Sequence, residues 1–219
     1  MKQPGDAPTL KVTVVPVTAF QQNCSIVRCE RTGRGAVVDP GGEVGRLLEA
    51  AKSCDATIEK ILLTHAHADH AGGTAALAAE LGVPIEGPHR DDQFLIDTIA
   101  QQAVLFGLGD DARPFTPTRY LQGGDEVAVG ELRFEVRHCP GHTPGHVVFY
   151  QPDEHLAFVG DVLFAGSIGR TDFPRGDHAT LLRSIREQLL TLPDDVVFVP
   201  GHGPTSNIGR ERATNPFLT

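Results

Sequence analysis

The chain has 219 residues, 40% of them hydrophobic, and carries a formal net charge of −9 at neutral pH. This length supports one sizeable core, so we expect a single domain over residues 1–219. The acidic balance argues against sequence-independent binding to nucleic acid or to an anionic membrane, because both require a basic face.

The first eight residues are polar and are interrupted by Pro4, Gly5 and Pro8. They lack the charged and apolar regions of a secretory signal, and no apolar run approaches the roughly 20 residues needed to cross a bilayer. We therefore expect a cytoplasmic protein. Its four cysteines are expected to be buried free thiols in a reducing compartment (Cys24, Cys29, Cys54 and Cys139).

The first third of the chain alternates between strand and helix patterns. Three β-rich runs, at 10–17, 24–29 and 36–38, are predicted to form a meander. A helix is predicted over 43–52, where apolar residues recur at helical spacing, and a strand over 58–64.

The rest of the chain continues this alternation. Helices are predicted over 74–81, closing at Gly82, over 91–106 and over 178–190. Strands are predicted at 83–85, within the alternating stretch 125–150, and at 156–159 and 196–199. Two strand-rich halves punctuated by helices predict an α/β fold with sheets in the middle and helices outside.

Four candidate metal ligands, His65, His67, Asp69 and His70, lie within six positions directly after a predicted strand. Residues two apart on extended backbone point to the same side, so His65 and His67 can reach one metal ion. The turn into the next helix lets Asp69 and His70 face a neighbouring one. Burying four such groups without a shared partner would be costly, which favours a metal site over a structural cluster. Imidazole and carboxylate donors together indicate a first-row transition metal without specifying which.

Three further candidate ligands, His142, Asp161 and His202, each lie at the end of a predicted strand. Loops at strand ends converge on one edge of a fold, where active sites accumulate. The remaining histidines lie in strands or polar turns, and we expect them to be hydrogen-bonding or surface residues (His89, His138, His146, His155 and His178).

The pattern His-x-His-x-Asp-His, followed by a distant His, Asp and His, resembles the metallo-β-lactamase superfamily from about Asp39 to the C-terminus. The resemblance implies an αβ/βα sandwich of two mixed β-sheets flanked by helices. It also implies two divalent metal ions, with zinc favoured over iron or manganese. The implied ligands are His65, His67 and His142 for one ion and Asp69, His70 and His202 for the other, with Asp161 bridging. Asp39 matches the aspartate that supports the ligands in this family, although a turn aspartate before proline is equally compatible with the sequence.

Three strings, at 141–146, 169–177 and 211–218, resemble the short bacterial glyoxalase II-like hydrolases. This resemblance implies hydrolysis of a small-molecule thioester, S-lactoylglutathione or a related acyl-thiol, to a hydroxy acid and a thiol. Asp69 would orient the attacking hydroxide in addition to binding metal. Arg170 and Arg175 are the candidates to bind an anionic end of the substrate, and surface ion pairs with Asp172 or Asp177 are the competing interpretation.

Two other enzyme classes use similar motifs. Persulfide dioxygenases share the string at 169–173 and bind one iron through two histidines and an aspartate, for which His65, His142 and Asp161 would serve. Nucleases of this superfamily usually carry a further large domain and basic surfaces, which an acidic chain of this length does not offer. The resemblance to longer glyoxalase II enzymes departs at the C-terminus, because only residues 203–219 follow His202. No oligomeric state follows from the sequence.

Overall fold

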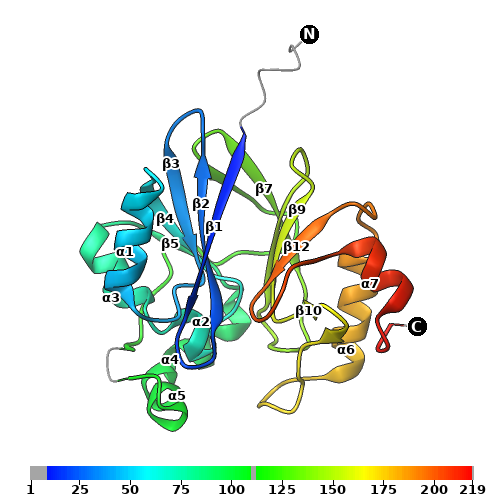
Figure 1. Ribbon diagram of the computed structural model, residues 1–219. Helices are drawn as coiled ribbons and strands as arrows, with labels where there is room; N and C mark the ends of the chain where they lie inside the picture. Colours follow the sequence, from blue (N-terminus) through cyan, green and yellow to red (C-terminus); the bar gives the residue numbers. More distant parts are fainter. Residues whose placement is uncertain (1–8, 110–111, 219) are drawn as a thin grey trace.

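The computed structural model describes residues 9–109 and 112–218, so the polar segment 1–8 lies outside the described residues. Two β-sheets lie face to face, and helices cover the outer side of each sheet (Figure 1). This arrangement confirms the predicted αβ/βα sandwich. Among the described residues, no helix is long and apolar enough to cross a membrane.

The first sheet has the strand order β1-β2-β3-β4-β5. Its first three strands pair antiparallel, whereas β3, β4 and β5 pair parallel, so the sheet is mixed. Helices α1 and α3 cover its outer face (Figure 1). The bounds are β1 Leu10–Val17, β2 Gln22–Cys29, β3 Arg34–Val38, α1 Val44–Ser53, β4 Thr57–Leu62, α3 Thr74–Leu81 and β5 Ile85–Glu86.

The second sheet has the order β13-β12-β9-β8-β7-β6 and is parallel only between β9 and β12. Its outer face is covered by α6, which continues into the wider turn η2, and by α7 (Figure 1). The bounds are β6 Glu126–Val129, β7 Leu132–His138, β8 Val147–Gln151, β9 Leu156–Gly160, α6 His178–Ser184, η2 Ile185–Leu189, β12 Val197–Pro200, β13 Ser206–Asn207 and α7 Ile208–Thr214.

The core consists of three main apolar layers, one between the sheets and one under each set of helices. Strand β8 shows why the sequence there is continuously apolar. Val147 and Phe149 point between the sheets, while Val148 and Tyr150 point toward the outer helices. Successive side chains on a strand alternate between faces, so a strand covered on both faces can be apolar at successive positions, as β8 is from Val147 to Tyr150.

The predicted helix over 91–106 was only partly right. The structure divides it into a short 3-10 turn η1 (Arg90–Asp92) and two helices, α4 (Gln93–Asp97) and α5 (Ile99–Phe106). The break is at Thr98, whose side-chain hydroxyl donates to the carbonyl of Phe94 at 2.8 Å. Such local side-chain bonds compete with the backbone hydrogen bonds of a helix. Helix α3 ends at Gly82, whose φ of 65° makes it the expected left-handed cap.

Several short elements were not predicted, because each is only two to seven residues long and has too few positions for a period to be visible. They are α2 (Ala68–Ala71), β10 (Leu163–Phe164), β11 (Ser167–Ile168), β13 and α7. Figure 1 shows α2 and β10 at the same edge of the sandwich, where the chain leaves the strands.

The four cysteines are free thiols, as expected, but only three of them are buried. Cys54 directly follows the last residue of α1 and is partly exposed. Burial raises the pKa of Cys139 to about 12, so its thiolate is not formed near neutral pH.

Candidate metal centre

The loop after β4 carries His65 and His67, and the short helix α2 that follows it carries Asp69 and His70. Thr64 anchors the start of this loop, because its backbone N–H and its hydroxyl donate to the two carboxylate oxygens of Asp39 at 2.7 and 2.6 Å. His67 is still extended, with φ −65° and ψ 148°, and α2 begins directly after it. The extended backbone from His65 to His67 places both imidazoles on one side, as the spacing predicted.

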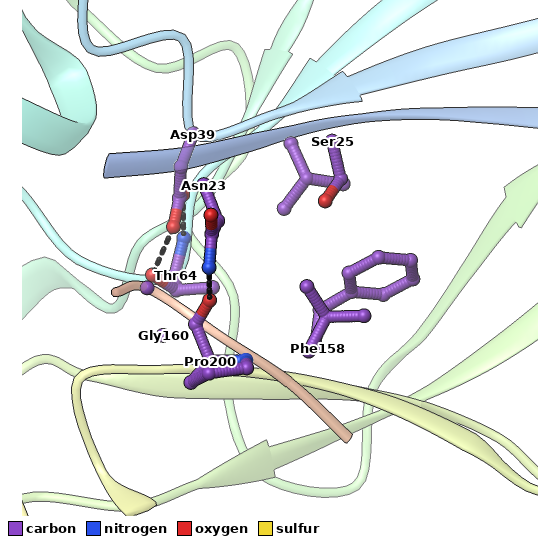
Figure 2. Close-up of a pocket in the computed structure, with 10 residues that line it drawn as sticks. Asn23, Ser25, Asp39, Thr64, Phe158, Gly160 and Pro200 are labelled. Atoms are coloured by element: carbon purple, nitrogen blue, oxygen red, sulfur yellow. Dashed lines mark hydrogen bonds between the residues drawn. The ribbon is translucent and has the colours of Figure 1, made fainter. Parts of the chain in front are cut away.

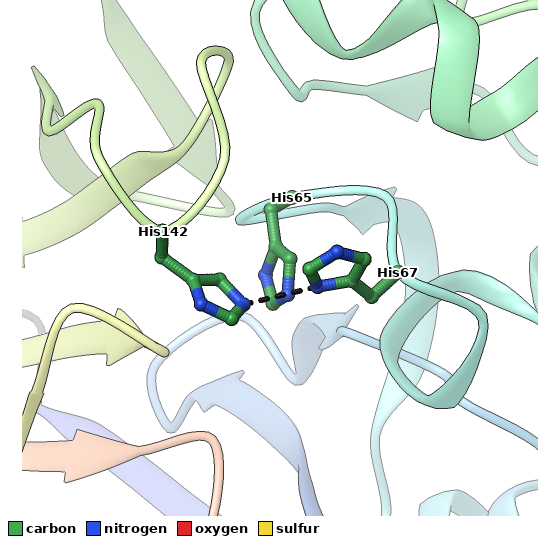
Figure 3. A group of neighbouring side chains, drawn as sticks. All are labelled: His65, His67 and His142. Atoms are coloured by element: carbon green, nitrogen blue, oxygen red, sulfur yellow. Dashed lines mark hydrogen bonds between the residues drawn. The ribbon is translucent and has the colours of Figure 1, made fainter. Parts of the chain in front are cut away.

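The first candidate ligand group joins His65 and His67 to His142 from the loop between β7 and β8 (Figure 3). One ring nitrogen from each residue lies within 4.8 Å of the others. Nδ1 of His67 and Nε2 of His142 are 3.0 Å apart. Three imidazoles from two separate loops thus converge on one point.

The second candidate group contains Asp69, His70 and His202. His202 follows β12, and its Nε2 lies 3.3 Å from Nε2 of His70 and 3.2 Å from an oxygen of Asp69. Gly201 allows this approach, because a Cβ at that position would overlap the carboxylate of Asp161 and the ring of His70. The motif Pro-Gly-His therefore needs its glycine.

Asp161, just beyond β9, lies between the two groups. One carboxylate oxygen is 3.3 Å from Nε2 of His70, and the other is 3.5 Å from Nε2 of His142. The second oxygen also lies 3.7 Å from Nε2 of His202. A carboxylate in this position can serve both groups at once.

Three of the candidate ligand histidines make a hydrogen-bond contact through Nδ1, the ring nitrogen that faces away from the centre, and these contacts fix the orientation of the rings. Nδ1 of His142 lies 2.7 Å from the carbonyl of Arg170, and Nδ1 of His202 lies 3.2 Å from the carbonyl of Phe20. Nδ1 of His70 lies 3.1 Å from Asp39. Such partners set the tautomer of metal-binding histidines, so each of these rings presents Nε2 to the centre.

The protonation states suit metal binding in the first group. Burial lowers the pKa of His67 to about 3, with repulsion from His142 acting in the same direction. Burial also holds the pKa of His65 well below the usual value for histidine, and it lowers the pKa of His142 from the usual value. These imidazoles are therefore neutral at neutral pH, the form that binds metal.

The carboxylates are ionised. Burial alone would raise the pKa of Asp161, but His70, His142 and His202 outweigh it and hold that pKa far below the usual value. The pKa of Asp69 is lowered as well, because His70 and His202 outweigh burial. In the same way the carboxylates raise the pKa of His70 despite its burial.

Nε2 of His65 is buried at the centre without a hydrogen-bond partner, and one buried oxygen of Asp161 has only its ion-pair contact with Nε2 of His70 at 3.3 Å. An unpaired buried polar atom costs free energy, and a bound cation would compensate both atoms. Together with the nitrogen–nitrogen approaches of 3.0 and 3.3 Å, these atoms fit the donor set that a pair of divalent ions requires.

Asp39 lies behind the centre and is buried. Its oxygens receive the two bonds from Thr64 and face Nδ1 of His70, so both oxygens already have partners. Although Asp39, His65 and His70 also lie close enough to form a third group, this use of the carboxylate suits a supporting role better than a ligand role.

Sequence reasoning missed Asn23, whose side chain bonds to Pro200 (Figure 2), two residues before His202. Its side-chain amide donates to the carbonyls of Pro200 and Gly203 at 3.1 and 2.8 Å, on both sides of His202. Its backbone N–H donates to Gly201. An asparagine near the start of a strand gives no local signal, because its partners lie about 180 residues away.

His146 is buried behind His65, on whose ring it stacks with centroids 4.6 Å apart. Its Nε2 accepts a hydrogen bond from the backbone N–H of Asp161 at 3.0 Å. His138 and His155 also make hydrogen bonds, so the expectation that these three are hydrogen-bonding residues is confirmed.

The two candidate substrate-binding arginines lie near the centre but have partners. Both guanidinium nitrogens facing Asp172 make hydrogen bonds, so Arg170 forms a two-point ion pair and also lies over the ring of Phe173. Arg175 donates to the carbonyl of Asp91 and lies over Phe94.

Aromatic rings line the exposed side of the centre. Phe173 contacts the ring of His67 with centroids 5.2 Å apart, and Phe106 lies 6.1 Å from both Phe173 and Phe20. Phe20 and Phe106 are 46% and 39% exposed, although burial would be favourable for both. An apolar wall thus stands beside the candidate ligands.

The metallo-beta-lactamase superfamily model matches residues 17–202, which include every candidate ligand. The chain belongs to this superfamily. The match extends over both sheets and confirms the family resemblance inferred from the motifs.

Two curated proteins and one solved structure show which members of the superfamily this chain is similar to. The chain is 46% identical to hydroxyacylglutathione hydrolase GloC of Haemophilus influenzae, over 95% of this chain and 98% of that protein. It is 32% identical to human mitochondrial persulfide dioxygenase ETHE1, over 87% of this chain and 69% of that protein. The crystal structure of TTHA1623 in a di-iron-bound form superposes with a TM-score of 0.86 at 39% identity, covering 94% of this chain and all of the other. The His/Asp cluster in this superfamily fold indicates a dinuclear metal site.

Proposed function

We propose that this chain is a two-metal thioester hydrolase that cleaves S-lactoylglutathione or a related acyl-thiol into a hydroxy acid and a thiol. The observation that carries the proposal is the position of Asp161 between two complete ligand groups, with oxygens 3.3 and 3.5 Å from Nε2 of His70 and His142. The 46% identity with hydroxyacylglutathione hydrolase GloC supports the substrate class.

The proposed ligands are His65, His67 and His142 for one ion and Asp69, His70 and His202 for the other, with Asp161 shared. We favour zinc as the native metal, with iron or manganese as the alternatives. Two bound divalent ions would supply a hydroxide near neutral pH and polarise the thioester carbonyl.

The chain's own groups would assist this reaction in two ways. Asp69 is ionised and only partly buried, so its carboxylate can orient the attacking water and accept its proton. The leaving thiol has a pKa near 8.5 and departs as the thiolate when the carbon–sulfur bond breaks. No separate acid is therefore required.

Substrate recognition by Arg170 and Arg175 is part of the proposal. For Arg170, binding an anionic substrate group would require an exchange of partner, because Asp172 now holds its guanidinium. The ion pair is exposed, and exposed pairs contribute little stability, so a substrate carboxylate can displace Asp172 at low cost.

The test is hydrolysis by protein loaded with a defined metal. Wild-type protein should bind two ions and release thiol from S-lactoylglutathione. The His70→Ala variant should no longer bind the second ion, and its kcat/KM should fall by more than about 100-fold. Removing a hydrogen bond that only supports a ligand would lower kcat/KM by less. His155→Ala, which changes an exposed histidine paired with Asp195, is the matched control. A His70→Ala variant with full activity would contradict the proposal.

A second candidate function is persulfide oxidation at one iron held by His65, His142 and Asp161. The identity with ETHE1 favours this alternative. The close approach of Asp69, His70 and His202 favours the two-metal proposal instead.

A further inference from the structure

Asp92 is a fully buried carboxylate that belongs to neither candidate ligand group. It ends η1, far from the histidine motif in sequence, at a point where the chain enters α4. Burial raises the pKa of Asp92 to about 7, while its hydrogen bonds lower it. A carboxylate in such a place is costly, so its contacts bear on its role.

All three side-chain hydrogen bonds of Asp92 come from the two loops that carry the first ligand group. One oxygen accepts from the backbone N–H of Ala66 at 3.2 Å and from the hydroxyl of Thr143 at 2.8 Å. The other oxygen accepts from the backbone N–H of Gly145 at 2.6 Å. Ala66 lies between His65 and His67, and Thr143 directly follows His142.

The packing around this carboxylate is tight. A Cβ at Gly145 would lie 2.7 Å from the Asp92 carboxylate carbon, so only glycine lets the loop approach so closely. The backbone reinforces the contact, because His89 donates to the carbonyl of Gly145 at 3.0 Å and Asp92 donates to that of His89. Both ligand loops are thus bound to one rigid turn.

We infer that Asp92 is a positioning residue that sets the spacing between the His65–His67 loop and the His142 loop, and with it the geometry of the first metal site. This inference rests on the metal centre of the proposed function. It does not depend on which substrate the centre cleaves.

The carboxylate is needed because all three contacts are donors. In an Asp92→Asn variant, an amide NH₂ at one position would face the N–H of Gly145, and at the other position it would face the N–H of Ala66. The hydroxyl of Thr143 can reverse and accept, but a backbone N–H cannot. Either orientation therefore removes one backbone bond, the one from Gly145 in the His142 loop or the one from Ala66 in the His65–His67 loop.

The test measures metal affinity rather than activity. Zn²⁺ and Co²⁺ are titrated into metal-free Asp92→Asn in competition with a chelator, and the Co²⁺ absorption spectrum reports the coordination geometry. We expect one of the two ions to bind about 10–100-fold more weakly, with an altered spectrum, while the other changes less. Asp91→Asn, the same change at the exposed neighbouring residue, should match wild type.

Thr143 provides a second pair of variants in case Asp92→Asn does not fold. Thr143→Val removes one bond to Asp92 and should weaken the same ion, whereas Thr143→Ser keeps the hydroxyl and should restore its affinity. Wild-type affinities and spectra in Asp92→Asn, or equal affinities in the two Thr143 variants, would overturn the inference. Tight metal binding by wild type without thioester cleavage would reject the proposed function alone.

Discussion

At the residue scale, the histidine cluster could be predicted because its information is local. His65, His67, Asp69 and His70 lie within six positions, and the alternation of extended backbone alone places the first two rings together. Asn23 and Asp92 were not predicted. Each acts through partners in distant loops, Pro200 and Gly203 for Asn23 and Gly145 for Asp92, and neither has a neighbouring motif that marks it.

The role of Asn23 leads to a prediction about stability. Asn23→Ala removes two side-chain hydrogen bonds to carbonyls on either side of His202. At about 1 kcal/mol for each bond, the free energy of unfolding should fall by about 2 kcal/mol. Urea denaturation of the metal-free protein measures it. Gln21→Ala removes a single exposed bond to Thr18 and should change the midpoint much less; equal effects of the two variants would contradict this account of Asn23.

The apolar wall beside the candidate ligands, formed by Phe20, Phe106 and Phe173, leads to a prediction about substrate binding. Phe173 contacts His67 on one side and Phe106 on the other. Phe173→Ala should raise KM for S-lactoylglutathione while leaving the number of bound metal ions at two, because the ring is not a ligand. Steady-state kinetics with metal analysis tests this. An unchanged KM would place the substrate elsewhere.

At the element scale, long helices with clear periods were predicted well. Helix α3 has the predicted bounds, and the predicted helix over 178–190 corresponds to α6 with η2. The predicted helix over 91–106 divides at Thr98 in the structure. The division was not predicted, because the side-chain bond from Thr98 to the preceding turn does not change the hydrophobic pattern. The two-residue strands β10, β11 and β13 form only because neighbouring backbone is available to pair with them.

Helix α5 offers a matched pair of substitutions. Ile99 is fully buried beneath the first sheet, whereas Leu105 on the same helix is 77% exposed. Ile99→Ala should lower the free energy of unfolding by about 2–5 kcal/mol, because it leaves a cavity. Leu105→Ala should stay within about 0.5 kcal/mol of wild type. Chemical denaturation compares the two, and a large effect of Leu105→Ala would show that its exposed side chain is covered in solution.

Helix α7 depends on a side-chain cap. Asn207 accepts a hydrogen bond from the backbone N–H of Arg210 at 2.8 Å. Asn207→Ala should cost about 0.5–2 kcal/mol of stability, and Asn207→Asp should retain most of it because the carboxylate also accepts this bond. Thermal or urea unfolding measures both variants. Equal loss in the two would mean that the amide acts by another contact.

At the scale of the whole molecule, the order of motifs along the chain was enough to predict the sandwich, because the family resemblance connects the motif order to one architecture. The sequence did not predict how the two sheets meet. That arrangement depends on the apolar layer between them, to which Val38 and Leu62 contribute from one sheet and Phe134 and Phe149 from the other.

The clustered histidines predict how the stability of the metal-free protein depends on pH. The pKa values of His65, His67, His142 and His146 are lowered, that of His67 to about 3, mainly by burial. In the unfolded chain these histidines have a pKa of about 6.5. As the pH falls below that value, the unfolded chain takes up protons at these positions and the folded chain does not, so the free energy of unfolding decreases as the pH decreases. The raised pKa values of His70, His202 and Asp92 oppose this trend, but they are fewer.

We therefore expect a lower urea midpoint at about pH 5 than at about pH 6.5 for metal-free protein. Bound metal should raise the midpoint at about pH 6.5, since it binds only the folded state. A midpoint that is unchanged or higher at the lower pH would mean that protonation of these clustered histidines does not oppose folding.

The central claim is that the two ligand groups joined by Asp161 form a two-metal hydrolytic centre, and one paired assay on protein of known metal content tests it. Thiol release from S-lactoylglutathione is measured beside oxygen consumption with glutathione persulfide. We expect two metal ions per chain and thiol release without oxygen uptake. One iron per chain with oxygen uptake and no thiol release would contradict it.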